Sequence, residues 1–202
     1  MLAFDFDGTL VDSNPIKWRA FERCFTEFPE QREEILAYCC GQHHTPRGDK
    51  FRHVYERILK RPYPPEIPAA LHARYEAETT QQIIAAPEVP GAERFLREAG
   101  RGREIALLSS TPHDVLTEII DRRRWRAYFR QVQGAPVDKA DWLRRARESR
   151  GLAPETLLFI GDTEEDAQAA AAAGCAFLGI GAEPRLGGYG PVAHDFLDLL
   201  NE

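Results

Sequence analysis

The chain has 202 residues, of which 43% are hydrophobic, and its formal net charge is −6. This length and composition can bury one full core, or one core with a small appended domain. The negative charge disfavours nucleic acid and anionic membranes as partners. No apolar run approaches the roughly 20 residues that span a bilayer, and no basic region precedes the acid at position 5. We therefore expect a soluble, cytoplasmic protein without a secretory signal.

The opening stretch MLAFDFDGTL has the period-two alternation of a β-strand, which Gly8 is expected to end. The alternation predicts that Asp5 and Asp7 project to the same side. Two neighbouring carboxylates repel each other and lose hydration when they are buried, so a fold keeps them only near water, a cation or a reaction. Asp5 and Asp7 are therefore the first candidates for a functional site.

Residues from about 15 to 85 are predicted to be helical throughout, because apolar residues recur there at spacings of three and four. The stretch RPYPPEIP, with its four prolines, predicts a stiff loop between two of the helices. The predicted helices are IKWRAFERCFTEF, REEILAYC, DKFRHVYERILK and EIPAALHARYEAETTQQII.

The cysteine pattern indicates neither a disulfide framework nor a metal centre. Cys24, Cys39, Cys40 and Cys175 show no CxxC spacing, as expected in a reducing compartment. The stretch CCGQHH contains zinc-binding residue types, but adjacent helical residues point about 100° apart and Gly41 is expected to end the helix. We favour a helix end followed by a polar loop.

From residue 87 onward, predicted helices and strands alternate. The strands are EIALLSS, a short one near RQVQGA, TLLFIGD and CAFLGI, and the helices are GAERFLREAG, HDVLTEIID, KADWLRRARES and EEDAQAAAAAG. This alternation predicts right-handed crossovers and a mainly parallel sheet. The expected fold is α/β: a Rossmann-like, three-layer core of residues 1–13 and 86–202, with residues 14–85 as an inserted all-α domain.

Polar residues end the predicted strands, at the edge where ligands of such sheets bind. Three acids, a further acid one turn along a helix, two hydroxyls and a lysine are expected to converge there. Oxygen ligands of this kind suit a hard cation such as Mg²⁺. The residues are Asp5, Asp7, Ser109, Ser110, Lys139, Asp162 and Asp166.

These residues carry a family resemblance. DFDGTLVDS, LLSS, Lys139 and FIGDTEEDAQAAAAAG resemble, in order, the four motifs of the haloacid dehalogenase superfamily of phosphotransferases. The helical insertion resembles the cap of the branch that includes phosphoglycolate phosphatase and β-phosphoglucomutase. The resemblance implies a Mg²⁺-dependent phosphatase that acts on a small phosphorylated metabolite through an aspartyl-phosphate.

The resemblance also implies roles for the acids. Asp5 would attack phosphorus. Asp7 would protonate the leaving alkoxide and later deprotonate water, and its backbone carbonyl would be a ligand of the Mg²⁺. The other metal ligands would be Asp5 and Asp162, with Asp166 bound directly or through water.

Three further residues would complete the phosphate site. Ser109 would donate a hydrogen bond to a phosphoryl oxygen, and Lys139 would neutralise Asp5 and the phosphate together. The backbone N–H of Ser110 would contribute to the same cradle.

Alternative functions can be weighed against the phosphatase by single sequence features. Dehalogenases and phosphonoacetaldehyde hydrolases resemble this chain but lack an acid at the position of Asp7, which favours phosphoester cleavage. A phosphomutase would keep the same residues and is the alternative; a non-catalytic phosphate-binding module is less favoured, because the acid set is intact. The arginine-rich stretch DRRRWRAYFR is interpreted as a solvated helix end rather than a nucleic-acid site.

Specificity is expected to come from the helical insertion. The stretch GQHHTPRGDKFRH brings His44 and Arg47 into one predicted loop. Arg47 lies between Pro46 and Gly48, and its planar fork can bind a carboxylate or phosphate at two points. We expect a small anionic phosphoester as the substrate, with Arg47 and His44 as candidate contacts; the sequence leaves the oligomeric state open.

Overall fold

The computed structural model describes residues 1–42, 45–63, 66–182 and 184–201. The chain forms two compact units: Met1–Asp12 together with Ala86–Glu202, and Ser13–Ala85. The first unit combines a sheet with helices, and the second is helical. In the described ranges no helix is both long and apolar enough to cross a membrane.

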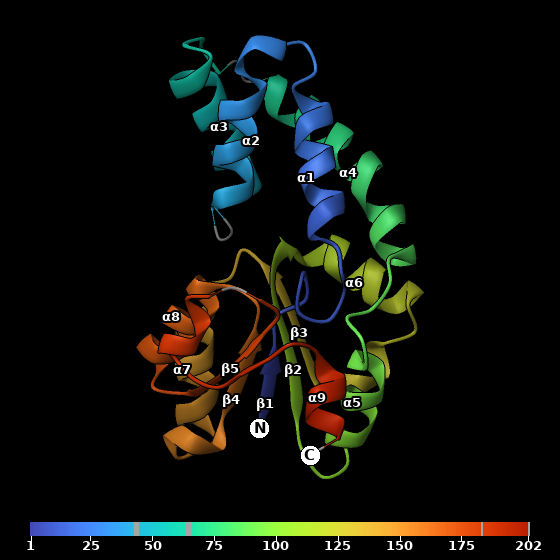
Figure 1. The fold of residues 1–202 in the computed structure, drawn as a ribbon, viewed down its shortest axis with the longest axis vertical. Coiled ribbons are helices and arrows are strands. Elements are labelled where there is room, and N and C mark those ends of the chain that lie inside the picture. Colours follow the sequence, from blue (N-terminus) through green and yellow to red (C-terminus); the bar gives the residue numbers. More distant parts are fainter. Residues whose placement is uncertain (43–44, 64–65, 183, 202) are drawn as a thin grey trace. The chain divides into compact units, whose positions relative to one another are not determined.

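The first unit is built on a parallel sheet (Figure 1). In the described residues its strand order is β3-β2-β1-β4-β5-β6, and each neighbouring pair is parallel. The order changes direction between β1 and β4, which makes their carboxyl ends a topological switch point where ligands bind. The parallel α/β sheet expected from the sequence is thus confirmed. The strands are β1 (Leu2–Phe4), β2 (Ile105–Pro112), β3 (Gln131–Ala135), β4 (Leu158–Gly161), β5 (Ala176–Ile180) and β6 (Val192–Ala193).

Helices cover both faces of this sheet (Figure 1). On one face α7 (Lys139–Ser149) packs against α8 (Glu164–Ala173), and buried alanines of α8 join a core with Phe159 of β4. On the other face α5 (Ala92–Ala99) packs against α9 (Phe196–Leu200), and the ring of Phe4 lies 6.2 Å from those of Phe95 and Phe196. α6 (His113–Arg122) packs against β2 and β3. These layers give the Rossmann-like arrangement.

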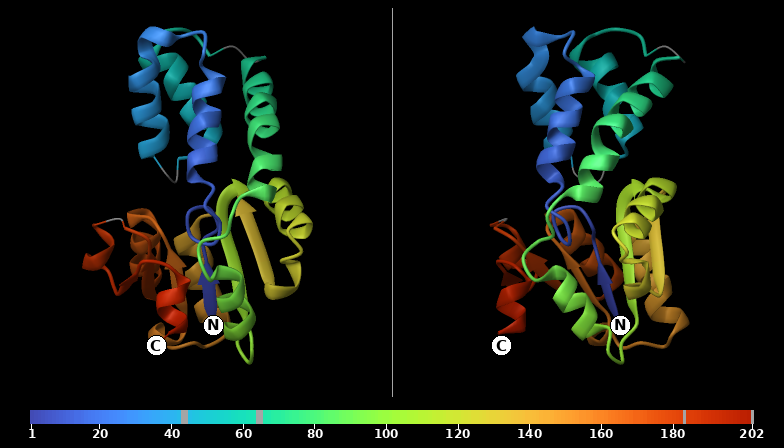
Figure 2. Two further views of the ribbon diagram at one scale, coloured as in Figure 1. Left: turned by 45° about the vertical axis from the view of Figure 1, so that its right-hand side comes forward. Right: turned by 90° about the vertical axis from the view of Figure 1, so that its right-hand side faces the viewer.

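The second unit is a bundle in which α1 lies beside α4 (Figure 2). Aromatic side chains fill its core: the ring of Phe21 lies 5.9 Å from that of Phe51 and 4.8 Å from that of Tyr75. Such ring pairs add to the free energy gained by burying apolar surface. The helices are α1 (Asn14–Cys24), α2 (Arg32–Gly41), α3 (Arg47–His53) and α4 (Ile67–Ala85).

Several element boundaries differ from those expected. β1 ends at Phe4, so that Asp5 and Asp7 follow the strand instead of forming its last residues. The helix predicted over 49–60 is α3 followed by a π-helical turn, Val54–Ile58. The end of α2 at Gly41 is confirmed. β6 and α9 were not predicted, because segments of two and five residues are too short to show periodicity.

Candidate active site

Asp5 and Asp7 lie where the chain leaves β1. The N–H of Asp5 still donates to the carbonyl of Ile160 on β4, 2.9 Å away, which holds this position against the sheet. Gly8 has a φ of 83°, a conformation that favours glycine, so the chain can turn directly after Asp7. Both acids are buried, with exposed fractions of 6% and 8%. The turn therefore presents two buried carboxylates at the carboxyl edge of the sheet.

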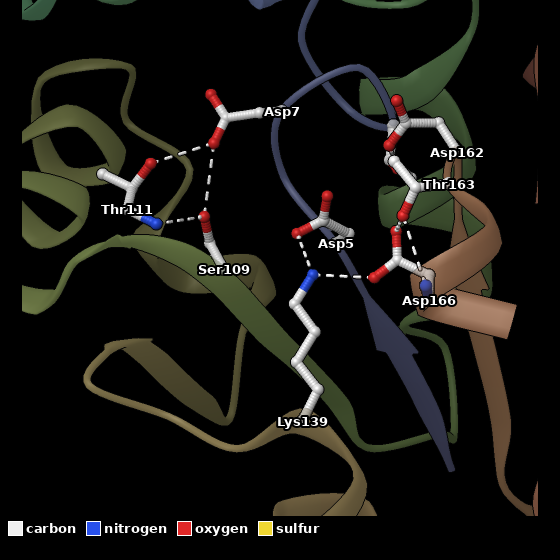
Figure 3. Close-up of polar contacts among 9 residues, drawn as sticks. Asp5, Asp7, Ser109, Thr111, Lys139, Asp162, Thr163 and Asp166 are labelled. Atoms are coloured by element: carbon white, nitrogen blue, oxygen red, sulfur yellow. Dashed lines mark hydrogen bonds and ion pairs between the residues drawn. The ribbon is translucent and has the colours of Figure 1, made fainter. Parts of the chain in front are cut away.

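Lys139 bridges two of the acids (Figure 3). Its Nζ donates to Oδ1 of Asp5 at 2.8 Å and to Oδ1 of Asp166 at 2.7 Å. Asp138 caps α7 by accepting a hydrogen bond from the N–H of Asp141, and this cap sets Lys139 as the first residue of the helix. The side chains of Lys139 and of both acids are buried. Water therefore screens these ion pairs little.

The turn after β4 supplies Asp162, and the first turn of α8 supplies Asp166. The hydroxyl of Thr163 donates to Oδ2 of Asp166 at 2.6 Å and accepts from the N–H of Asp166, which caps the start of α8. A Cβ at Gly161 would lie 2.6 Å from the Cβ of Asp166, so only glycine allows this close approach. Asp162 is half-buried, and its Oδ1 accepts a hydrogen bond from the hydroxyl of Thr9 at 2.9 Å.

Asp7 has different partners from Asp5. Its Oδ2 accepts hydrogen bonds from the hydroxyl of Thr111 at 2.9 Å and from that of Ser109 at 3.3 Å (Figure 3). β2 extends through Pro112, and its pairing register with β3 shifts between Leu108 and Pro112. The two hydroxyls are two residues apart and therefore reach the same side of the strand. Asp7 thus accepts hydrogen bonds from two neutral hydroxyls, whereas Asp5 is ion-paired with a cation.

The crowding of acids changes their proton affinity. Burial, together with the negative charges of Asp166 and Asp7, raises the pKa of Asp5 to about 7, even though Lys139 opposes the shift. Burial and the negative charges of Asp5 and Asp166 likewise raise the pKa of Asp162 well above its usual value. Burial alone would lower the pKa of Lys139, but Asp166 and Asp5 outweigh it and raise that pKa. The site therefore stabilises positive charge and disfavours further negative charge.

Three of the carboxylates are arranged to hold a cation. One oxygen from each of Asp5, Asp162 and Asp166 lies within 4.8 Å of the other two. Carboxylate oxygens suit Mg²⁺, which takes one or two carboxylates together with water and phosphate. A divalent cation would also offset the negative charge that raises the pKa values of Asp5 and Asp162. The donor set and its charge therefore fit Mg²⁺.

The remaining predicted residues are placed differently. Ser110 is exposed at the carboxyl end of β2. His44 lies outside the described residues. The loop predicted around Arg47 is wrong, because Pro46 has an extended ψ of 140° and α3 begins directly at Arg47. Within the helical unit, the guanidinium of Arg47 lies 2.9 Å from a carboxylate oxygen of Glu76 and 4.7 Å from the ring centre of Tyr75.

Sequence reasoning missed three threonines. Thr9, Thr111 and Thr163 each place a hydroxyl on a carboxylate of the site. Thr9 and Thr163 lie inside the quoted motifs DFDGTLVDS and FIGDTEEDAQAAAAAG, so their positions were available as a signal. Thr111 was missed because β2 was expected to end before it.

Comparison with known proteins gives a consistent assignment. A family model described as haloacid dehalogenase-like hydrolase matches residues 2–180. Phosphoglycolate phosphatase 1 from Pseudomonas aeruginosa is 31% identical over 199 residues, which cover 90% of this chain and 70% of that protein.

Solved structures agree with this fold. CbbY from Rhodobacter sphaeroides in complex with xylulose-(1,5)bisphosphate has a TM-score of 0.76 at 19% identity, over 98% of this chain and 95% of that one. A haloacid dehalogenase-like family hydrolase from Streptococcus pneumoniae has a TM-score of 0.74 at 24% identity, over 99% and 96% of the two chains. At these identities the likeness is one of fold.

Proposed function

Because the chain belongs to the haloacid dehalogenase-like hydrolase family, we propose that it is a Mg²⁺-dependent phosphatase that hydrolyses a small phosphorylated acid through an aspartyl-phosphate. The proposal rests on one observation: two neighbouring buried acids have different hydrogen-bond partners. Asp5 is ion-paired with Lys139, and Asp7 accepts hydrogen bonds from Ser109 and Thr111. One carboxylate is thereby suited to attack, and the other to transfer a proton.

In the first half-reaction a carboxylate oxygen of Asp5 forms a bond to phosphorus, and the bond from phosphorus to the alkoxide oxygen breaks. The carboxyl group of Asp7 gives its proton to the departing alkoxide. Lys139 stays bonded to Asp5 and neutralises part of the negative charge that gathers during the transfer. The products of this step are an alcohol and phosphorylated Asp5.

In the second half-reaction water attacks phosphorus, and the carboxylate of Asp7 takes its proton. The bond between phosphorus and Asp5 breaks, which releases inorganic phosphate and restores both acids. Thr111 keeps Asp7 oriented in both directions of proton transfer. The hydroxyl of Ser109, which donates its single proton to Asp7 without substrate, is proposed to turn and donate it to a phosphoryl oxygen when substrate binds, as the family resemblance implies.

Asp5, Asp162 and Asp166 would hold Mg²⁺, which when bound supplies the positive charge that lets a carboxylate approach an anionic phosphate. The backbone carbonyl of Asp7 is the further ligand that the resemblance implies. Lys139 fixes the orientation of Asp5 and Asp166 by binding one oxygen of each.

We assign the helical unit Ser13–Ala85 the role of a cap that selects the substrate. The likeness to phosphoglycolate phosphatase 1 supports phosphoglycolate or a similar phosphorylated acid as the substrate. Such a molecule carries a carboxylate as well as a phosphate, and a guanidinium such as that of Arg47 binds either group at two points.

The test is phosphate release from phosphoglycolate by the purified protein, with Mg²⁺ and with a chelator. We expect turnover only with Mg²⁺, and its loss in the Asp5→Asn variant, because an amide of nearly the same shape is a poor nucleophile. Mass spectrometry of acid-quenched parent enzyme should find phosphate on Asp5. Asp121→Asn, which changes an exposed acid of the same unit, is the matched control and should retain activity.

Turnover by Asp5→Asn within tenfold of the parent would contradict the role of Asp5. Transfer of phosphate between two positions of a sugar phosphate, without release, would instead support the phosphomutase alternative.

A further inference from the structure

A pocket lies where the chain enters β2 and β3, at the end of the sheet opposite the acids. It has a volume of about 530 Å³ and is formed by the loop between α5 and β2 together with the residues that lead into β3. In Figure 1 this loop lies at the same end of the sheet as the N-terminus. Ile105 lines the pocket, and Ser109 lies four residues further along β2, or about 13 Å at the usual rise of a strand. The pocket is therefore separate from the candidate active site.

Arginines dominate its lining. Arg97, Arg101, Arg103 and Arg130 contribute to the wall, against a single acid, Glu104. That acid is ion-paired with Arg150, which lies outside the lining and whose Nε is 3.1 Å from the carboxylate. The lining therefore carries an excess of positive charge in a protein whose net charge is negative.

Three of these arginines have no acidic partner in the part of the chain that the structure describes. Within the described ranges the side chains of Arg101, Arg103 and Arg130 make no hydrogen bond or ion pair. Arg97 faces Glu93 at 3.7 Å, and Glu93 also accepts a hydrogen bond from the hydroxyl of Tyr128. A lone exposed arginine is ordinarily solvated, but like charges gathered around one concavity repel each other, and a bound anion removes that repulsion.

We propose that this pocket binds a polyphosphorylated small molecule. A volume of this size is typical of small-molecule sites. Guanidinium groups bind phosphate oxygens in two-point fashion, so three uncompensated arginines match a ligand with at least two phosphate groups better than a single phosphate. Tyr128 and Phe129 add an aromatic wall beside the cations. The inference is independent of the proposed phosphatase activity, because it uses none of the active-site residues.

The test is isothermal titration calorimetry of the full chain with inorganic tripolyphosphate at low ionic strength, in a chelator so that no metal-dependent binding contributes. We expect one tripolyphosphate per chain, bound at least tenfold more tightly than inorganic phosphate. The double variant Arg103→Gln/Arg130→Gln should weaken binding at least tenfold. These side chains are exposed, so the variant should keep the thermal unfolding midpoint of the parent.

The matched control is Arg145→Gln, which changes a 79% exposed arginine of the same unit outside the pocket and should change the affinity less than twofold. Equal affinities of the double variant and the parent would place binding elsewhere and overturn the proposal. Equal losses in the control and the double variant would do the same, since they would show attraction to overall charge. Tighter binding of single-stranded DNA than of tripolyphosphate through the same arginines would also reject a small-molecule site.

Discussion

Lys139 and Asp5 are 134 positions apart in the chain, yet Nζ of the lysine lies 2.8 Å from Oδ1 of the aspartate. The same ammonium is 2.7 Å from Oδ1 of Asp166. Because both carboxylates are buried, water cannot take the place of the lysine as their partner. The pairing links the start of α7 to the residue that follows β1 and to the first turn of α8, so the site depends on how these three elements pack together.

We expect Lys139→Gln to lower kcat/KM for phosphoglycolate by a factor of about 100 or more. The reason is that the charge developing on phosphoryl oxygens loses a preorganised cation. The variant should also lose about 3 kcal/mol of stability, because two buried carboxylates lose their partner. Steady-state kinetics at saturating Mg²⁺ and urea unfolding in chelator measure the two effects. Activity within tenfold of the parent would show that Lys139 is not needed for the chemistry.

Asp7→Asn should slow both half-reactions, because one carboxyl group serves as acid and then as base. A substrate with a very good leaving group needs little protonation, so the phosphorylated form of Asp5 should accumulate with an aryl phosphate. Rapid quenching followed by mass spectrometry detects this form. Hydrolysis of the phosphoenzyme as fast as in the parent would be incompatible with the role given to Asp7.

Asp162→Asn should weaken Mg²⁺ activation more than Asp166→Asn does. Asp162 accepts its observed hydrogen bond from the neutral hydroxyl of Thr9, whereas one oxygen of Asp166 is already bound to Lys139. Titration of activity against Mg²⁺ compares the two variants, and the half-saturating concentration should rise at least tenfold for Asp162→Asn. Equal shifts in both variants would remove the distinction between the two ligands.

The metal-free protein should lose stability as the pH rises from about 5 to about 8. In the folded protein the pKa of Asp5 is raised to about 7, so Asp5 keeps a proton that the unfolded chain has lost. Its stabilising contribution is complete below the unfolded pKa and is lost as the pH rises through about 7. The raised pKa of Asp162 acts in the same direction. Urea unfolding at both pH values, in a chelator, measures the slope.

Mg²⁺ should reverse this loss at the upper pH by binding the crowded carboxylates. As a matched variant, Asp162→Asn keeps an acceptor for Thr9 but removes one charge, and should raise metal-free stability near pH 8 by about 1 kcal/mol. Stability that is flat or rises over this range in the parent would show that the acids are not crowded in solution.

The parts of the fold that follow from periodicity could be predicted, and those that depend on tertiary contacts could not. The alternation of helices and strands after residue 87 was sufficient to predict the parallel sheet, because each crossover helix carries its own apolar stripe. The predicted positions of Asp5 and Asp162 at the carboxyl ends of two strands then implied that their carboxylates would lie at the same edge of the sheet. By contrast, the bonds of Thr111 to Asp7 and of Arg47 to Glu76 join segments distant in the sequence, and no local pattern specifies them.

Two roles can be distinguished for Arg47. Its ion pair with Glu76 would stabilise the helical unit, whereas the proposed contact would bind the substrate. We expect Arg47→Ala to raise KM for phosphoglycolate about tenfold or more while barely changing hydrolysis of an aryl phosphate, which has no second anionic group to lose. A hydrogen bond to a charged group is worth roughly 1.5 to 3 kcal/mol, which sets this scale. Glu76→Gln is the matched control: it removes the same ion pair but keeps the guanidinium, so KM for phosphoglycolate should stay within threefold of the parent. Steady-state kinetics with both substrates, together with thermal unfolding midpoints, separate the two roles. If both variants raise KM and lower the midpoint alike, Arg47 supports the helical unit and does not bind the substrate.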